Sequence, residues 1–254
     1  SYSFSAANEA LQTLRDKQIP LIPVTSKTDA EVRLLREELH NNEPYIVENG
    51  CAVIIPSGYF SEMPDETLED GSGILRFSPP YAQLREFFVN YRHKNGCRCE
   101  GFGDWSSHEV AKHTGLSEEK SALAKQRLGS EPFIWNDSEA AFDRFLDAAS
   151  ASGLRCIRGG RFFHLLGDAD KAKAIDALLA MFQQYRQIKP VTVALGDSPN
   201  DAKMLESADI AVVIKKHDGS HLPYTGNNRI IFTEEIGPIG WNRAILTIIN
   251  EQGA

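Results

Sequence analysis

Helical and strand-like hydrophobic patterns alternate along the first third of the chain. Residues 5–17 carry apolar side chains at helical spacing, and residues 19–25 form a short apolar run that predicts a buried strand. Residues 28–31 have the T-x-x-E pattern of a capping box, so we expect a helix to begin there and run to about Leu39.

The same alternation continues after this helix and returns in the last third. Residues 45–50 and 52–56 predict two strands around a turn at Asn49-Gly50. In the last third, continuous apolar runs predict strands that are covered on both faces. These later elements are a helix over 171–186, strands over 191–195, 210–214 and 229–232, and a terminal helix that carries Trp241, Ile245, Ile248 and Ile249.

The middle of the chain is more polar and predicts a separate small α/β unit. Strands that alternate with helices on either side of it favour an α/β fold with a doubly wound parallel sheet. We therefore expect a discontinuous core domain over 1–81 and 166–254, with residues 82–165 inserted as a second domain.

Composition narrows the class of protein further. A formal charge of −8 argues against a general nucleic-acid binder. No apolar run approaches the roughly 20 residues that span a bilayer, so we expect no membrane partner. Four cysteines in a chain of 254 residues do not suggest a disulfide framework, and we expect a reducing, cytoplasmic location.

The segment 195–201, LGDSPND, carries the clearest chemical signal. Asp197 and Asp201 are four residues apart and directly follow a predicted buried strand, whose carboxyl end borders the ligand crevice in a doubly wound sheet. Carboxylate oxygens, with the amide of Asn200, suit Mg²⁺. The alternative is an ordinary surface turn, because Asp, Asn, Pro and Ser are common turn residues.

Two further segments offer groups that could hold a phosphate. Thr25, Ser26 and Lys27 lie between the predicted strand and the N-terminus of the next helix, a position that favours anions; alternatively they are a simple capping cluster, with Thr28 as the cap. Lys171 begins a helix, where its charge opposes the helix dipole, which suggests another purpose; a solvated surface lysine is the plainer alternative.

Taken together, these segments resemble motifs II, III and IV of the haloacid-dehalogenase (HAD) superfamily: Thr25, Lys171 and residues 196–201. Within it, further segments resemble the mannosyl-3-phosphoglycerate phosphatases over essentially the whole chain. They are Glu48-Asn49-Gly50, Gly101-Phe102-Gly103-Asp104, His113-Thr114-Gly115-Leu116, Glu131-Pro132-Phe133, Gly160-Arg161-Phe162-Phe163-His164 and Gly237-Pro238-Ile239-Gly240-Trp241.

This resemblance implies a Rossmann-like core with an inserted cap that recognises the substrate. It implies Mg²⁺-dependent hydrolysis of mannosyl-3-phosphoglycerate to phosphate and mannosylglycerate, a compatible solute, through an aspartyl-phosphate intermediate. Asp197 and Asp201 would bind Mg²⁺ and Asn200 would orient their loop. Thr25 and Lys171 would contact the phosphoryl group. Glucosyl-3-phosphoglycerate remains an alternative substrate, because few contacts distinguish a hexose epimer.

Additional candidates for substrate contact follow from the same resemblance. Ser26 and Lys27 adjoin Thr25, and Asn49 is a candidate for the crevice between core and cap, although its plainer role is in a turn. Arg161 and His164 are the candidates for recognising the glyceryl carboxylate and the sugar, and the planar guanidinium of Arg161 suits the carboxylate. The alternative for His164 is a core histidine that is bonded to the backbone. We expect residues 161–166 to form an extended strand, on which Arg161 and His164 face opposite sides, so only one of them would contact the substrate.

The sequence departs from the superfamily at motif I. No aspartate stands in the D-x-D-x-[TV] pattern, whose first carboxylate is the nucleophile and whose second is the general acid and base. We expect motif I to precede Ser1, in a longer protein or in one fused to a synthase. The alternative is a catalytically inactive protein that binds phosphorylated ligands.

Overall fold

The computed structural model describes residues 4–187 and 189–253, which form two compact units. One unit joins the described residues up to Leu21 to those from Leu179 onward, and the other runs Ile22–Leu178. No helix in these described ranges is long and apolar enough to cross a membrane. The core and cap expected from the sequence divide the chain differently, and that division stays a prediction.

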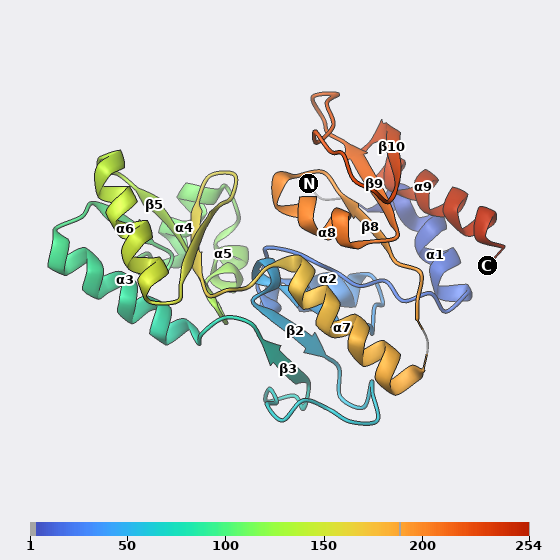
Figure 1. The fold of residues 1–254 in the computed structure, drawn as a ribbon, viewed down its shortest axis with the longest axis horizontal. Coiled ribbons are helices and arrows are strands. Elements are labelled where there is room, and N and C mark those ends of the chain that lie inside the picture. The colour runs from blue at the N-terminus through green and yellow to red at the C-terminus, as the bar shows by residue number, and fades with distance from the viewer. Residues whose placement is uncertain (1–3, 188, 254) are drawn as a thin grey trace. The chain divides into compact units, whose positions relative to one another are not determined.

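The unit that contains both chain ends is built on a three-stranded parallel sheet of order β10-β9-β8 (Figure 1). The helices cover it through predicted apolar faces: Leu14 packs with Ile245 and Ile249. Its elements are η1 (Ser5–Ala7), α1 (Asn8–Asp16), β8 (Val193–Gly196), η3 (Pro199–Asp201), α8 (Ala202–Ser207), β9 (Ile210–Lys215), β10 (Arg229–Ile236) and α9 (Gly237–Gln252).

Of the three strands in this sheet, the sequence predicted that each is covered on both faces. Only the central strand, β9, is buried along the whole predicted range. Residues 210–214 of β9 are all buried. In contrast, Val191 is 65% exposed and β8 begins at Val193. The strand starts later than predicted because the Thr192 amide donates to the Asp209 carboxylate and not to the backbone of a neighbouring strand.

Unit Ile22–Leu178 contains an antiparallel sheet of order β1-β2-β3. The predicted capping box is confirmed, because the Thr28 hydroxyl accepts from the Glu31 amide while the Glu31 carboxylate accepts from the Thr28 amide. The elements of this part are α2 (Asp29–Glu38), β1 (Tyr45–Val47), η2 (Glu48–Gly50), β2 (Ala52–Ile55) and β3 (Gly73–Arg76).

The strand predicted over residues 19–25 is wrong. That segment contains one isolated parallel bridge, between Val24 and Ile46, and no regular strand. Pro20 and Pro23 lack the amide hydrogens that a ladder needs. The backbone is nevertheless anchored, because the Thr25 amide donates to the Ile46 carbonyl at 3.0 Å.

The same unit holds a four-stranded antiparallel sheet of order β4-β5-β7-β6. Figure 1 shows α3 and α6 beside it, and the buried rings of Phe88, Phe133 and Phe145 pack between these elements. The elements are α3 (Tyr81–Asn95), β4 (Cys99–Gly101), α4 (Ser107–Thr114), α5 (Glu118–Ala124), β5 (Ser130–Trp135), α6 (Glu139–Ala151), β6 (Arg155–Arg158) and β7 (Phe163–Leu166). The helix α7 (Lys171–Arg186) begins in this unit and crosses the boundary after Leu178.

Candidate active site of a phosphatase

The loop after β8 places two carboxylates in one turn, as predicted. Asp197 is exposed at the carboxyl end of the strand, and Asp201 is 7% exposed inside the turn. One Asp201 oxygen, Oδ2, accepts from the Ser198 amide at 3.1 Å, the Asp197 amide at 3.3 Å and the Ser198 hydroxyl at 2.6 Å. Asp201 therefore organises the loop, while the Asp197 carboxylate stays accessible.

A glycine precedes this loop because the Asp201 side chain lies directly over it. A Cβ on Gly196 would come within 2.6 Å of the Asp201 Cβ and 3.0 Å of its Oδ2. No L side chain tolerates such contacts. Gly196 thus allows the buried carboxylate to reach back over the end of β8, which fixes the direction of the loop.

Oxygen is the only donor type in this loop, and that fits a hard divalent cation. The exposed carboxylate of Asp197 can bind such a cation directly. The Asp201 carboxylate can do so only with the oxygen that the loop amides do not use, and the Asn200 side chain is exposed beside it. Within the described ranges no three His, Cys, Asp or Glu side chains converge as a closed metal site.

The Thr25 segment lies in the other unit and is held by main-chain hydrogen bonds. The Thr25 carbonyl accepts from the Asn49 amide at 2.9 Å, and the Thr25 hydroxyl accepts from the Lys27 amide at 3.2 Å. Ser26 is exposed. Lys27 forms an ion pair with Glu31 at 3.1 Å, so its charge is already partly balanced along the helix.

The Asn49-Gly50 turn brings Lys171 toward this segment. Glu48, Asn49 and Gly50 all have positive φ, at 51°, 61° and 94°. A Cβ on Gly50 would lie 2.2 Å from the Asp170 carbonyl oxygen and 2.8 Å from the Lys171 amide nitrogen. Asn49 is 5% exposed and lies in this turn, which is the alternative that the sequence offered to a position in the crevice between core and cap. The turn therefore connects Thr25 with the first residue of α7.

Lys171 is 6% exposed, so the plain alternative of a solvated surface lysine is wrong. Lys173 is the solvated lysine, and it pairs with Asp168 at 2.6 Å. A buried ammonium at a helix N-terminus is costly, because desolvation and the helix dipole both oppose the charge. That cost is consistent with a lysine kept for an anionic ligand.

Arg161 does not lie on the strand that carries His164, which corrects the argument about opposite faces. The strand β7 begins at Phe163, because Arg158 and Phe163 already pair and the Gly159 amide donates to the Phe162 carbonyl. Arg161 is exposed in the intervening turn. Its guanidinium donates to the carbonyls of His113 and Thr114 at the end of α4, at 3.1 and 3.0 Å.

His164 is on β7, opposite Pro132 of β5 and Ile157 of β6. Burial, and then the nearby Arg127 guanidinium, lower the pKa of His164 to about 3, so the ring is neutral at physiological pH. Its Nδ1 atom is buried and has no hydrogen-bond partner among the described residues. A neutral ring suits a sugar hydroxyl better than a carboxylate, because it contributes no charge.

The predicted site residues thus form two groups. Thr25, Asn49 and Lys171 are connected within unit Ile22–Leu178, whereas Asp197 and Asp201 share one loop of the other unit. That the two groups act on one phosphate stays a prediction, as do the individual roles of these residues.

Sequence reasoning missed one buried ion pair beside the first group. Glu48 is 0% exposed, and its Oε2 lies 3.3 Å from Nε of Arg127, whose side chain is 3% exposed. Glu48 belongs to a segment that the resemblance singled out, yet nothing in the local pattern pairs it with a residue this distant in the chain.

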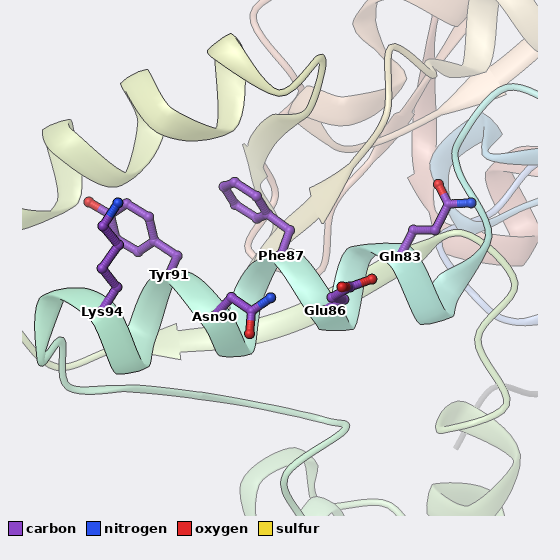
Figure 2. Close-up of a pocket in the computed structure, with 6 residues that line it drawn as sticks. All are labelled: Gln83, Glu86, Phe87, Asn90, Tyr91 and Lys94. Atoms are coloured by element: carbon purple, nitrogen blue, oxygen red, sulfur yellow. The ribbon is translucent and has the colours of Figure 1, made fainter.

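A surface hollow on α3 lies apart from all these predicted residues. Figure 2 shows the helix and the side chains that line the hollow, which has a volume of about 360 Å³. The residues are Gln83, Glu86, Phe87, Asn90, Tyr91 and Lys94. None carries the chemistry expected of a phosphatase site. The Phe87 and Tyr91 rings stack on each other, and Phe145 contacts Phe87 in a tilted and Tyr91 in an edge-on arrangement.

Solved structures place the fold in a known class. A haloacid dehalogenase-like hydrolase from Bacteroides thetaiotaomicron matches with a TM-score of 0.62 and 14% identity over 96% of this chain and 92% of that one. A phosphatase of the HAD superfamily from the same organism matches with a TM-score of 0.58 and 16% identity over 98% and 87%. The fold is that of HAD enzymes, an α/β core with a cap, as predicted.

Curated relatives identify the branch of that class. A glucosyl-3-phosphoglycerate/mannosyl-3-phosphoglycerate phosphatase from Methanococcoides burtonii is 40% identical over 99% of this chain and 92% of its own length. A protein of the same name from Persephonella marina is 38% identical over 98% and 92%. No protein-family model matches the chain. The protein is a HAD phosphatase, a phosphoric monoester hydrolase. It belongs to the glucosyl-3-phosphoglycerate/mannosyl-3-phosphoglycerate phosphatase family.

Proposed function

We propose that this phosphatase hydrolyses mannosyl-3-phosphoglycerate or glucosyl-3-phosphoglycerate, releasing phosphate and the glycosylglycerate. The observation that carries this proposal is the identity of 38–40% with two proteins named for these substrates, over nearly the whole chain. Mannosylglycerate is a compatible solute, so the proposal implies a role in osmolyte synthesis. The cysteines, which are all free thiols, support a reducing, cytoplasmic setting.

The Asp197 loop is proposed to hold Mg²⁺, with Asp197 as the direct carboxylate ligand. Asp201 positions that loop and contributes a ligand directly or through water, while Asn200 orients it. Bound Mg²⁺ would supply positive charge to the phosphoryl oxygens, as in other phosphoryl transfers. The oxygen-only donors and the exposure of Asp197 support this assignment.

Thr25 and Lys171 are proposed to contact the phosphoryl group. The hydroxyl of Thr25 would donate a hydrogen bond to a phosphate oxygen, with Ser26 and Lys27 next to it. The ammonium of Lys171 would neutralise charge that develops in the transition state, which is the main demand of phosphoryl transfer. Its burial supports this role, because a charge removed from water interacts strongly with a bound anion.

The four-stranded sheet β4-β5-β7-β6 and the turn before β7 are proposed to recognise the sugar and glycerate of the substrate. His164 is proposed to contact a sugar or glycerate hydroxyl, and the low pKa that burial and the Arg127 charge give its ring keeps it neutral for that role. Arg161 remains the candidate for the glycerate carboxylate. Its bonds to the end of α4 hold the guanidinium in place, and it is exposed.

The chemical step is proposed to pass through an aspartyl-phosphate, as the HAD resemblance implies. Its nucleophile is the first aspartate of motif I, which is not among these 254 residues. The competing proposal is an inactive protein that binds phosphorylated ligands through Thr25 and Lys171.

Phosphate release distinguishes the two proposals. The full-length gene product should be assayed with both glycosyl-3-phosphoglycerates and with simple phosphate esters, with Mg²⁺ and after chelation. We expect metal-dependent turnover with a marked preference for the glycosyl substrates. Ligand-induced thermal stabilisation without any turnover would favour the inactive binding protein instead.

A further inference from the structure

Glu48 is a fully buried carboxylate that connects three segments of unit Ile22–Leu178. Its side chain points to the loop before β5. Oε1 accepts from the Leu128 amide at 2.6 Å, and Oε2 accepts from the Gly129 amide at 3.2 Å and from the Ser130 hydroxyl at 2.8 Å. Arg127 completes the cluster with its ion pair and donates to the Ser130 carbonyl at 3.2 Å.

The backbone of the same turn reaches the two predicted phosphate contacts. The Glu48 amide donates to the Lys27 carbonyl, and the Asn49 amide donates to the Thr25 carbonyl, both at 2.9 Å. On its other side Gly50 packs directly on the amide of Lys171. The turn of residues 48–50 is therefore joined to Thr25 and Lys171 by the backbone of Asn49 and Gly50, and to the loop before β5 by the Glu48 side chain.

Energetics argue that this arrangement does more than stabilise the fold. Left-handed backbone at the two non-glycine residues Glu48 and Asn49 costs on the order of 1 kcal/mol each or more. A buried ion pair such as Glu48–Arg127 often contributes less than apolar side chains of similar volume would. Such strain and buried charge persist where the surroundings fix a required geometry.

The four-stranded sheet, whose leading loop hydrogen-bonds to Glu48, carries the candidate substrate contact His164. β5 begins at Ser130 and pairs with β7, so Pro132 lies opposite His164. Arg127 is also the charge that lowers the pKa of His164, together with burial. A displacement of the 127–130 loop would therefore change the position of His164 as well as the positions of Thr25 and Lys171.

We propose that Glu48, held by Arg127 and Ser130, is a positioning residue. It fixes the positions of Thr25 and Lys171 relative to the four-stranded sheet that carries His164. This proposal rests on the phosphatase function proposed above. Glu48 does not touch the substrate in this account. It acts through the turn that it fixes, so its loss should lower turnover even with an ester that carries neither sugar nor glycerate.

The chain offers a matched control in its second buried glutamate. Glu131 is also 0% exposed, lies on the same four-stranded sheet, and pairs with Arg85 at 2.7 Å. The Tyr81 hydroxyl donates to it at 2.6 Å, as the Ser130 hydroxyl donates to Glu48. Within the described part of the chain, Glu131 hydrogen-bonds with Tyr81, Arg85 and Gly103, and not with the Thr25 segment or Lys171.

The test compares two pairs of variants of the full-length gene product: Ser130→Ala with Tyr81→Phe, and Glu48→Gln with Glu131→Gln. Thermal unfolding measures the stability that each loses, and turnover of p-nitrophenyl phosphate measures the phosphate site alone. We expect kcat to fall about 10-fold in Ser130→Ala and about 100-fold in Glu48→Gln, because small misplacements of catalytic groups are costly. The Glu131 pair should stay within about twofold of wild type, because no group near the phosphate moves.

Each outcome has one meaning. Equal losses of kcat within a pair, at comparable losses of stability, would overturn the positioning role. If Glu48→Gln does not fold, the milder Ser130→Ala and Tyr81→Phe pair decides. If the wild type hydrolyses no ester, the proposed function fails, and calorimetric binding of inorganic phosphate replaces turnover. Weaker binding in Ser130→Ala alone then supports the inference, whereas equal binding in both variants, or none in the wild type, overturns it.

Discussion

Replacing Gly50 by alanine should be among the most damaging single-methyl additions in this protein. Gly50 has φ of 94°, which alanine adopts only at a cost of about 1–2 kcal/mol. The added Cβ would also stand 2.2 Å from the Asp170 carbonyl oxygen, a backbone atom that no side-chain rotation can move away. Overpacking of this kind typically costs another 1–3 kcal/mol or so. The free energy of unfolding should therefore fall by about 2–5 kcal/mol.

Gly115 supplies the matched control for this substitution. Its φ of 79° is also left-handed, but a Cβ there meets nothing within 4 Å. Gly115→Ala should therefore lose only the backbone contribution, about 1–2 kcal/mol. Urea unfolding at unchanged m-value measures both variants. Gly50→Ala should also lower kcat, because the clash lies at the amide of Lys171. Equal destabilisation by the two substitutions would refute the close approach of Gly50 to α7.

Three further predictions follow from the site. Asp197→Ala in the full-length gene product should abolish metal-dependent turnover with little loss of stability, since the side chain is exposed; near-normal activity would contradict the metal assignment. Chelation should likewise abolish wild-type turnover, and added Mg²⁺ should restore it. The pKa of His164 is about 3 when folded and near 6.5 when unfolded, so between these values only the unfolded state takes up the proton, and stability falls as pH falls from about 6.5 toward 3. Urea titrations should show a slope of up to about 1.4 kcal/mol per pH unit there that His164→Asn lacks; identical slopes would contradict the buried neutral ring.

Local signals predicted the elements that depend on local interactions. The capping box at Thr28 and the helix that begins at Lys171 were confirmed, because hydrophobic spacing and caps act within a few residues. The run at 19–25 was misread, since apolar content outweighed the two prolines. The helix α3 gives only a weak helical pattern in the sequence, because its buried residues Leu84 and Phe88 are surrounded by polar and charged ones.

The candidate site was predictable in its residue types and not in its contacts. Asp197 and Asp201 share a turn, so their proximity follows from the sequence alone. Gly50 approaches the backbone of Asp170 and Lys171, and the Glu48–Arg127 pair joins a turn to a loop far along the chain. No periodicity or local motif encodes such long-range contacts, which only the folded chain brings about.

The same limit explains the error about Arg161. The pattern suggested a strand that continued through it, but a short turn between β6 and β7 removes it from the ladder. In that turn its guanidinium is free to reach the last carbonyls of α4, where cations are favoured by the helix dipole.

The release of inorganic phosphate from glycosyl-3-phosphoglycerates tests the central claim most directly. The full-length gene product should be assayed side by side with the mannosyl and glucosyl compounds, with Mg²⁺, with chelator, and as the Asp197→Ala variant. The account predicts rapid release from at least one glycosyl substrate, only with metal and only when Asp197 is present. Absence of release from both substrates under all conditions, or release that ignores both chelator and Asp197→Ala, would contradict it.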